Sequence, residues 1–220
     1  MFPWGIKDTP LEDFTGPRKW QEKILREMTI HIQRNGMKDL PEMFRMAVAS
    51  GRGIGKSALV SWIVLWMLST RLGSTVIVTA NTEQQLRSRT WAELGKWLTL
   101  SINSHWWAKT ATTIKPSGWF DEALERDLKI DTGYYYAQAQ LWSEENPDAF
   151  AGIHSSYGVC LIMDEASGIP SPIYSVSEGF FSEPTPNRFW FTFSNPRRNQ
   201  GPFYDSFHSA KPFWKNEQID

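Results

Sequence analysis

Cysteine is almost absent from this sequence: Cys160 is the only one among 220 residues. A single thiol cannot form a disulfide within the chain, so the fold must depend on its core. The chain starts at Met1, and no basic segment followed by an apolar stretch comes after it, as a secretory signal would require. We therefore expect a protein of the cytosol.

Long apolar runs are also missing. The longest strongly apolar stretch, residues 58–68, is interrupted by Ser61. It falls well short of the roughly 18 residues that a membrane span needs, so we expect no membrane partner. The overall hydrophobic content of 41% is nevertheless ample for a buried core. This length and composition predict one sizeable domain, alone or with a small appendage.

An excess of charge of either sign is the third thing the sequence lacks. It has 23 basic and 24 acidic residues, and its formal net charge is −1. No global positive field therefore indicates a nucleic-acid partner. Contact with DNA would have to come from a local patch or from several copies acting together.

Apolar periodicity predicts strands and helices in alternation along the first part of the chain. Strand, helix and strand in this order favour an α/β fold with a mostly parallel sheet and right-handed crossovers. The tail has no settled period, and residues 143–153 are typical of a turn and loop. The predicted elements are helix 17–34, strand 43–50, helix 56–72, strand 74–80, a helix after Thr82, a strand within 131–142, strand 158–166, a helical segment flanked by prolines, and strand 188–196.

The segment "SGRGIGKSA", residues 50–58, nearly matches the phosphate-binding pattern G-x-x-x-x-G-K-[ST], with Ser50 at the position of the first glycine. Gly51, Gly53 and Gly55 allow positive φ angles and a close approach of the backbone to an anion. Successive N–H groups and the start of the following helix would then point at phosphate oxygens. A small serine fits at a position that requires only a small side chain.

Lys56 and Ser57 complete this predicted loop. The lysine would place a positive charge near the β and γ phosphates, and the serine hydroxyl would bind Mg²⁺. The alternative is a glycine-rich turn without a ligand, which the sequence G-K-S at the start of an apolar helix disfavours. The predicted nucleotide-binding loop comprises Ser50, Gly51, Arg52, Gly53, Ile54, Gly55, Lys56, Ser57 and Ala58.

The apolar run "CLIMDEA" ends in two carboxylates, Asp164 and Glu165. A strand that ends there would place both at the carboxyl edge of a parallel sheet, where ligands of this fold class bind. Because adjacent residues of a strand point to opposite sides, the two suit different tasks. We expect Asp164 near the Mg²⁺ shell and Glu165 toward the water that attacks the γ phosphate.

Two weaker signals are consistent with this prediction. The strand in "TFSNP" ends in Ser194 and Asn195, whose hydroxyl and amide groups could lie beside the γ phosphate. On its own, this segment fits a polar turn initiated by Asn-Pro better. Gln21, in "PRKWQ", is by itself an ordinary exposed helical residue.

Together these segments resemble the ATPase domain of the large terminase subunit of tailed double-stranded DNA phages. The resemblance covers about residues 15–209 and rests on the order and spacing of the motifs. It implies a P-loop NTPase fold of the additional-strand, catalytic-glutamate type that uses ATP and Mg²⁺. The motifs that carry it are "PRKWQEKIL", "SGRGIGKSA", "VTANTEQQLRSRTW", "LIMDEASGIP" and "TFSNPRRNQGPFYDSF".

The resemblance also implies roles and partners. It makes Gln21 the adenine contact and Glu165 the catalytic glutamate, and it makes an arginine within the loop, here Arg52, a common feature. It implies a homo-oligomeric ring around double-stranded DNA in the host cell cytoplasm, with the small terminase subunit and the portal of the procapsid as partners. We expect an N-terminal arm over residues 1–14, the ATPase domain over 15–200, and a lid or linker over 201–220.

Two features depart from the family. Relatives usually continue into a nuclease domain, for which these 220 residues leave no room, so we expect no DNA cleavage. Some relatives have an arginine just before the motif that corresponds to "LIMDEASGIP", where this chain reads "FAGIHSSYGV" without one. Arg52 is then the best candidate to place charge on the transferring phosphate, followed by Arg87, Arg89 and Arg126.

The sequence therefore predicts an ATP-hydrolysing motor domain that moves double-stranded DNA into a viral procapsid. A helicase-like ATPase is an alternative, although such enzymes usually carry a second similar domain. An assembly protein held together by bound ATP, with incidental turnover, is another. A small-molecule kinase is disfavoured, because Glu165 suits the activation of water.

Overall fold

Strands and helices alternate along the chain in the computed structural model, which describes residues 1–36, 38, 41–150, 152–153 and 155–219. Residues 151 and 220, within the predicted loop and tail, lie outside this set. The strands are β1 (Phe44–Ser50), β2 (Thr75–Thr79), β3 (Trp107–Lys109), β4 (Thr113–Pro116), β5 (Tyr136–Ala139), β6 (Val159–Asp164), β7 (Arg188–Ser194) and β8 (Lys215–Ile219). The helices are α1 (Lys19–Asn35), α2 (Lys56–Thr70), α3 (Glu83–Gln85), a π-helical turn (Leu86–Trp91), α4 (Ala92–Leu100), α5 (Gly118–Leu128), α6 (Ser171–Ser177) and α7 (Pro202–Asp205).

The strands form one sheet in the order β3-β4-β5-β2-β6-β7-β1-β8. All pairings from β5 to β8 are parallel, and only the pairings that involve β3 and β4 are antiparallel. The predicted α/β fold with a mostly parallel sheet is confirmed. Strand β7 lies between β1 and β6, so the sheet has the additional strand that the resemblance implied.

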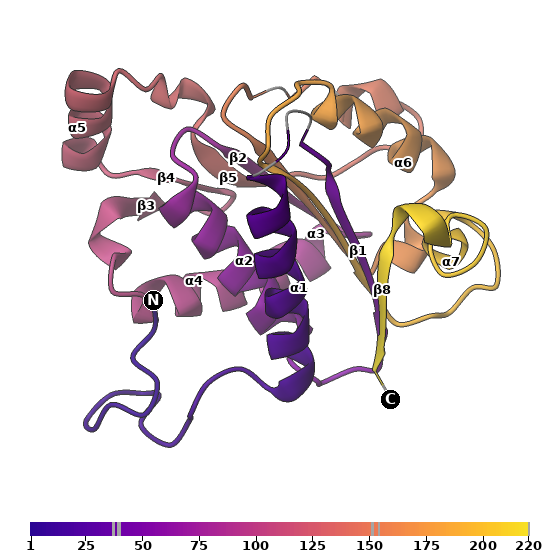
Figure 1. Cartoon of the computed structure of the whole chain (residues 1–220), viewed down its shortest axis with the longest axis horizontal. Helices are drawn as coiled ribbons and strands as arrows, with labels where there is room; N and C mark the ends of the chain where they lie inside the picture. Colours follow the sequence, from indigo (N-terminus) through magenta and orange to yellow (C-terminus); the bar gives the residue numbers. More distant parts are fainter. Residues whose placement is uncertain (37, 39–40, 151, 154, 220) are drawn as a thin grey trace.

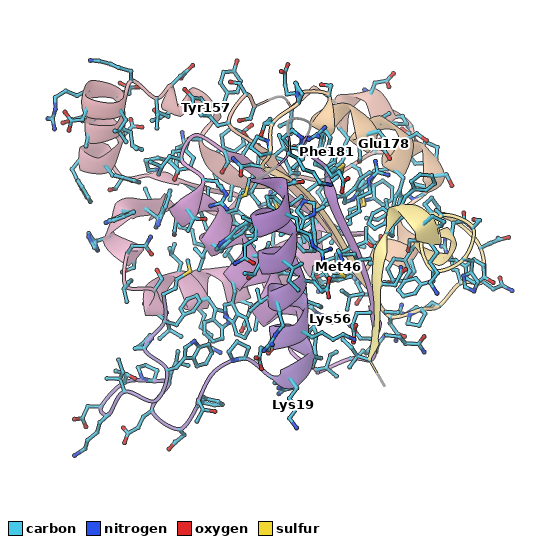
Figure 2. All side chains as sticks on the ribbon, viewed as in Figure 1. Lys19, Met46, Lys56, Tyr157, Glu178 and Phe181 are labelled. Carbon is cyan, nitrogen blue, oxygen red and sulfur yellow. The ribbon has the colours of Figure 1, made fainter. Side chains whose placement is uncertain are left out.

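Each central strand packs on helices through both of its faces (Figure 1). Alternate residues of β1 enter different clusters: Met46 and Val48 pack with α1, α2 and α4, whereas Ala47 and Ala49 pack on the side of α6. Strand β6 alternates in the same way. Figure 2 shows Met46 in the interior and Phe181 near α6. A strand covered on both faces must be apolar at every position, which explains the uninterrupted runs in the sequence.

Helix α2 is the most deeply buried of the helices α1, α2 and α4, which pack on one face of the sheet. Nine of its residues, from Leu59 to Leu68, are buried, because it lies between the sheet and the neighbouring helices. It begins directly after Gly55, whose φ of 94° is a left-handed conformation that glycine adopts at little cost. In the described part of the chain, no helix has the length and apolarity that a bilayer crossing needs.

Residues 101–130 and the tail contain elements that apolar periodicity did not indicate. Strands β3 and β4 are short, and β8 is the polar segment "KNEQI" at the edge of the sheet beside β1. Two ion pairs of 2.6 Å hold β8 to α1, Lys215–Glu27 and Lys23–Glu217. An edge strand tolerates such charged side chains, so its sequence shows no alternation of apolar residues.

The first residues of the chain pack onto the domain. Phe2 and Trp4 lie against Trp62 of α2 and Trp97 of α4, with ring centroids 5.1 Å apart for Phe2–Trp97 and 5.7 Å for Trp4–Trp62. These edge-to-face contacts are the arrangement that aromatic pairs prefer. The division into an arm, a domain and a lid at residues 14 and 200 stays a prediction.

His31 of α1 is a buried titratable group outside the lining of the cavity described below. Its Nε2 atom lies 3.1 Å from the carbonyl oxygen of Glu42 and 3.0 Å from Nδ2 of Asn35. Burial lowers the pKa of His31 below its usual 6.5, and the Glu42 carbonyl and carboxylate oppose this effect only in part. The neutral imidazole is therefore the form that the fold favours.

The free energy of unfolding should consequently fall as the pH drops below about 6.5, because the unfolded chain then takes up a proton that folded His31 resists. Above that pH the contribution is fully present. Urea unfolding at several pH values between 5.5 and 8 measures it. The His31→Gln variant should lose this part of the pH dependence, whereas the exposed-site control His208→Gln should keep it. An unchanged profile in His31→Gln would contradict the prediction.

Candidate nucleotide-binding site

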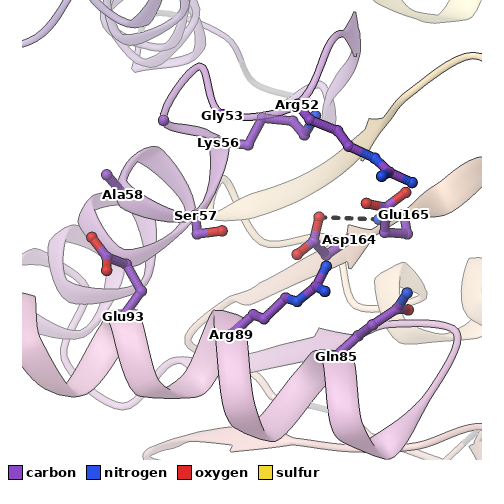
Figure 3. Close-up of a pocket in the computed structure, with 11 residues that line it drawn as sticks. Arg52, Gly53, Lys56, Ser57, Ala58, Gln85, Arg89, Glu93, Asp164 and Glu165 are labelled. Atoms are coloured by element: carbon purple, nitrogen blue, oxygen red, sulfur yellow. Dashed lines mark hydrogen bonds between the residues drawn. The ribbon is translucent and has the colours of Figure 1, made fainter.

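A cavity of about 380 Å³ opens at the carboxyl edge of the sheet, beside the segment between β1 and α2. The loop and the start of α2 form one wall, residues of the helical run 83–100 form the opposite wall, and the end of β6 lies between them (Figure 3). The lining residues are Arg52, Gly53, Gly55, Lys56, Ser57, Ala58, Gln85, Arg89, Glu93, Asp164 and Glu165.

The loop backbone is built around two glycines with positive φ, Gly53 at 73° and Gly55 at 94°. The ammonium group of Lys56 folds back onto the loop, where it donates to the carbonyl oxygen of Gly51 at 2.6 Å and to Oγ of Ser50 at 3.2 Å. Burial lowers the pKa of Lys56, and the nearby carboxylates of Glu165 and Asp164 act in the opposite direction. Among the described residues, the Lys56 ammonium donates hydrogen bonds only to oxygens of the loop itself.

These groups fit a bound phosphate and a magnesium ion. A Cβ atom added to Gly53 would meet nothing within 4 Å, so open space lies beside the loop backbone. Ser57 and Asp164 both line the cavity and offer a hydroxyl and a carboxylate. Magnesium is typically held by one or two carboxylates together with phosphate oxygens and water. Among the described residues, no group of three or more His, Cys, Asp or Glu lies close enough together to hold a metal ion.

Asp164 is the last residue of β6 and is buried at the floor of the cavity. Its Oδ2 accepts a hydrogen bond of 2.7 Å from the Thr90 hydroxyl, and its Oδ1 accepts one of 3.0 Å from the N–H of Glu165. Burial raises the pKa of Asp164, and the bond from Thr90 counteracts this. The two donors come from different segments, so the carboxyl group is held from two sides.

Glu165 lies beyond the end of β6 rather than on the strand. Its φ of 54° is left-handed, which is uncommon for any residue with a side chain. Its carbonyl oxygen accepts bonds of 3.0 Å from Nδ2 of Asn81 and from the N–H of Gly168. A Cβ atom at Gly168 would lie 2.2 Å from Asn81 Nδ2, so only glycine permits this approach.

The argument from strand alternation was therefore wrong for Glu165, because β6 ends at Asp164. The different roles predicted for Asp164 and Glu165 stay predictions. The turn after β6, and not the pleat of a strand, directs the Glu165 side chain. Figure 3 shows its carboxylate and the guanidinium of Arg52 pointing toward one another across the cavity mouth.

Gln21 contacts the loop rather than the cavity. Its Oε1 accepts the N–H of Arg18 at 2.8 Å, and its Nε2 donates to the carbonyl oxygen of Gly55 at 2.9 Å. Arg18 in turn donates to the carbonyl oxygen of Ile54 at 2.9 Å. Gln21 thus links the start of α1 to the loop. Its predicted adenine contact stays a prediction.

Ser194 and Asn195 lie behind the cavity wall. The buried Ser194 hydroxyl accepts from the N–H of Ser167 at 3.1 Å and contacts the Ser167 hydroxyl at 2.8 Å. The Ser167 hydroxyl donates to the carbonyl oxygen of Asn195 at 3.1 Å. These bonds tie the end of β7 to the turn after Glu165. Direct contact of Ser194 or Asn195 with a γ phosphate stays a prediction.

The second wall was predicted only in part: Arg89 was among the arginines ranked behind Arg52, whereas Gln85 and Glu93 were not named as site residues. Gln85, Arg89 and Glu93 follow one another at intervals of four residues and face the loop from the helical run. Among the arginines ranked behind Arg52, Arg87 pairs with Glu83 at 2.9 Å and Arg126 pairs with Asp127 at 2.7 Å. The four-residue spacing was the available signal, but it does not indicate which face of the helix meets the loop.

Comparison with known proteins gives one relative that shows the family of this chain. No family model matches the chain. A protein described as a probable terminase, large subunit, from Enterobacteria phage P7 is 30% identical over 170 residues, which cover 74% of this chain and 31% of that protein. This chain is a homologue of a phage large terminase. The resemblance predicted from the sequence motifs is thereby confirmed, and the match spans about a third of the relative's length.

Solved terminase structures share the fold. The ATPase domain of the Thermus phage P74-26 large terminase superposes with a TM-score of 0.59 at 18% identity, covering 93% of this chain and 81% of that one. The HK97 bacteriophage large terminase gives 0.61 at 13%, covering 94% and 40%. A large terminase from a thermophilic bacteriophage, solved with ADP, gives 0.60 at 16%, covering 91% and 44%. The predicted P-loop NTPase fold is confirmed by these matches to terminases.

The bond between Thr90 and Asp164 generates a prediction for stability. Thr90→Val replaces the hydroxyl by a methyl group and leaves a buried carboxyl oxygen without its donor, which should lower the free energy of unfolding by about 1–3 kcal/mol. Thr90→Ser keeps the hydroxyl and should cost clearly less. Urea unfolding at pH 7 compares the two variants. Equal losses in both would mean that packing, not the hydrogen bond, makes Thr90 important.

Proposed function

We propose that this chain binds ATP with Mg²⁺ in the cavity and hydrolyses it, as the ATPase of a motor that moves double-stranded DNA into a viral procapsid. The observation that supports this most directly is the meeting of Lys56 and Ser57 with Asp164 and Glu165 in one cavity at the carboxyl edge of the sheet. The homology to a phage large terminase supports the same reaction.

The loop and Lys56 would bind the phosphates. Backbone N–H groups of residues 50–58 and the start of α2 favour an anion, because they offer unpaired donors and the positive end of the helix dipole. The Lys56 ammonium would exchange its bonds to Gly51 and Ser50 for phosphate oxygens. Ser57 and Asp164 would hold Mg²⁺, which neutralises charge on the β and γ phosphates when bound.

Glu165 would orient and deprotonate the attacking water. It lines the cavity next to Asp164, and the turn after β6 fixes its backbone through Asn81 and Gly168. Arg52 faces it from the loop and would place positive charge on the transferring phosphoryl group (Figure 3). Gln21 would contribute by supporting the loop and by contacting adenine, and Ser194 with Asn195 would report the γ phosphate to a lid formed by residues 201–220.

The wider assembly belongs to the same proposal. We propose that several copies form a ring around DNA in the host cell cytoplasm, together with the small terminase subunit and the portal. A net charge of −1 gives a single copy little attraction for DNA, whereas a ring can line a channel with basic side chains from each member. DNA cleavage is not part of the function proposed for these residues.

Two substitutions separate binding from turnover. Lys56→Ala should abolish productive ATP binding, since the loop amides alone do not replace a cation near the β and γ phosphates. Glu165→Gln should keep ATP binding and lower turnover by about 10²- to 10⁴-fold, the usual contribution of a general base. Labelled-nucleotide binding and phosphate release measure the two quantities.

Exposed residues elsewhere provide matched controls for these two changes, Lys7→Ala for the lysine and Glu144→Gln for the glutamate. Near-normal ATP hydrolysis in Lys56→Ala would contradict the assignment of residues 50–58 as a phosphate-binding loop. Loss of ATP binding before turnover in Glu165→Gln would make Glu165 a structural or metal-binding residue instead.

Assembly should raise the hydrolysis rate per molecule. An arginine supplied by a neighbouring subunit can contribute about 10³- to 10⁵-fold to phosphoryl transfer, so the monomer should be slow. The rate is measured over a dilution series with and without double-stranded DNA. A high rate that stays constant down to the monomer would show that one chain holds a complete site. Oligomers that form with ATP but show no stimulation by DNA would favour the assembly protein over the motor.

A further inference from the structure

Arg89 is a cation of the cavity wall that faces the phosphate loop. It projects from the helical run toward Asp164, on the side opposite Lys56 and Ser57 (Figure 3). A polyanion placed along the loop would therefore lie between Lys56 on one side and Arg89 on the other. A ligand that contacts the loop alone would not reach the positive charge of Arg89 on the opposite wall.

The π-helical turn Leu86–Trp91 determines this direction. Leu86, Thr90 and Trp91 of the turn are buried, whereas Arg89 is exposed to the cavity. Thr90, the residue after Arg89, donates a hydrogen bond from its hydroxyl to Asp164. The backbone of Arg89 therefore has a fixed position relative to the end of β6. Single π-helical turns of this kind occur frequently at functional sites.

Arg89 also has no competing partner. Neither a hydrogen bond nor an ion pair engages its side chain within the described ranges, in contrast to Arg87 and its partner Glu83. Glu93, one turn away, already accepts from Nε1 of Trp97 at 2.8 Å and lies 3.7 Å from Lys96. The guanidinium is thus available to a ligand.

The charged side chains that line the cavity balance one another. Three cations and three carboxylates line it, so neither sign is in excess before a ligand binds. Mg²⁺ would be associated with Asp164, and Lys56 would be engaged by the phosphates that the loop surrounds. A third phosphate would add negative charge beside Glu165. Arg52 and Arg89 would then be the cations left to neutralise it.

We infer that Arg89 contacts the terminal phosphate of the bound nucleotide and makes the site prefer a nucleoside triphosphate to a diphosphate. This rests on the proposed function and adds a specificity-determining residue to it. Because Arg89 belongs to the same chain as the loop, the preference is a property of the monomer. An arginine donated by a neighbouring subunit would instead act only in the assembly.

The test compares the affinities of two fluorescent nucleotides in the presence of Mg²⁺, a labelled ADP and a labelled β,γ-imido analogue of ATP. The wild-type chain, Arg89→Ala, Arg89→Lys and the neighbouring control Arg87→Ala are measured at dilutions where the chain is monomeric. Arg89→Ala should weaken the triphosphate analogue about tenfold or more, the usual size of a hydrogen bond to a charged group, and leave ADP within about twofold. Arg89→Lys should restore part of the preference, and Arg87→Ala should match the wild type.

Three outcomes would overturn the inference. Equal weakening of both nucleotides in Arg89→Ala would mean that the arginine supports the wall without contacting the terminal phosphate. No change in Arg89→Ala, with the wild type binding normally, would overturn the role of Arg89 and leave the proposed function intact. Failure of the wild-type chain to bind either nucleotide would overturn the proposed function and the role of Arg89 together.

Discussion

A carboxylate buried at the end of β6 needs hydrogen-bond donors, and the Thr90 hydroxyl and the Glu165 N–H provide them. Without such donors, burial of the charged form would carry a large free-energy penalty. The two donors belong to segments that lie on different sides of Asp164, the helical run after β2 and the turn after β6. Satisfying one buried group therefore fixes the wall formed by the helical run relative to the floor of the cavity.

The parallel register of the strands determines where this group lies. Strand β7 pairs with β6 and β1 so that Phe193 lies beside Asp164 and Ser194 beside Ala49. The carboxyl ends of β1, β6 and β7 thus meet at one edge of the sheet. Strand β7, the last of the three in the sequence, lies between the other two. The loop after β1, the turn after β6 and the polar end of β7 come together for this reason alone.

Local chemistry explains which parts of the site could be predicted. Glycine spacing and G-K-S specify the loop through backbone conformation, and the apolar run before Asp164 specifies a buried strand, so both were visible without a structure. The direction of Arg89 depends on a π-helical turn and on a long-range bond to β6, and neither leaves a periodic signal. Gln21 was singled out by resemblance and Ser194 by its place at the end of a predicted strand, but tertiary contacts decide that their polar atoms face protein groups. Strand β8 was missed because a charged edge strand lacks apolar alternation.

The left-handed backbone of Glu165 sets protein stability against the role proposed for its side chain. A residue with a Cβ atom pays roughly 1 kcal/mol or more for this conformation, whereas glycine adopts it freely. Replacement of Glu165 by glycine would therefore relieve strain and remove the carboxylate in a single step. Selection for heat resistance alone would favour such chains. Under the role proposed for Glu165, selection for turnover would retain the glutamate, and improving the fold and improving the activity would then require opposite changes at this position.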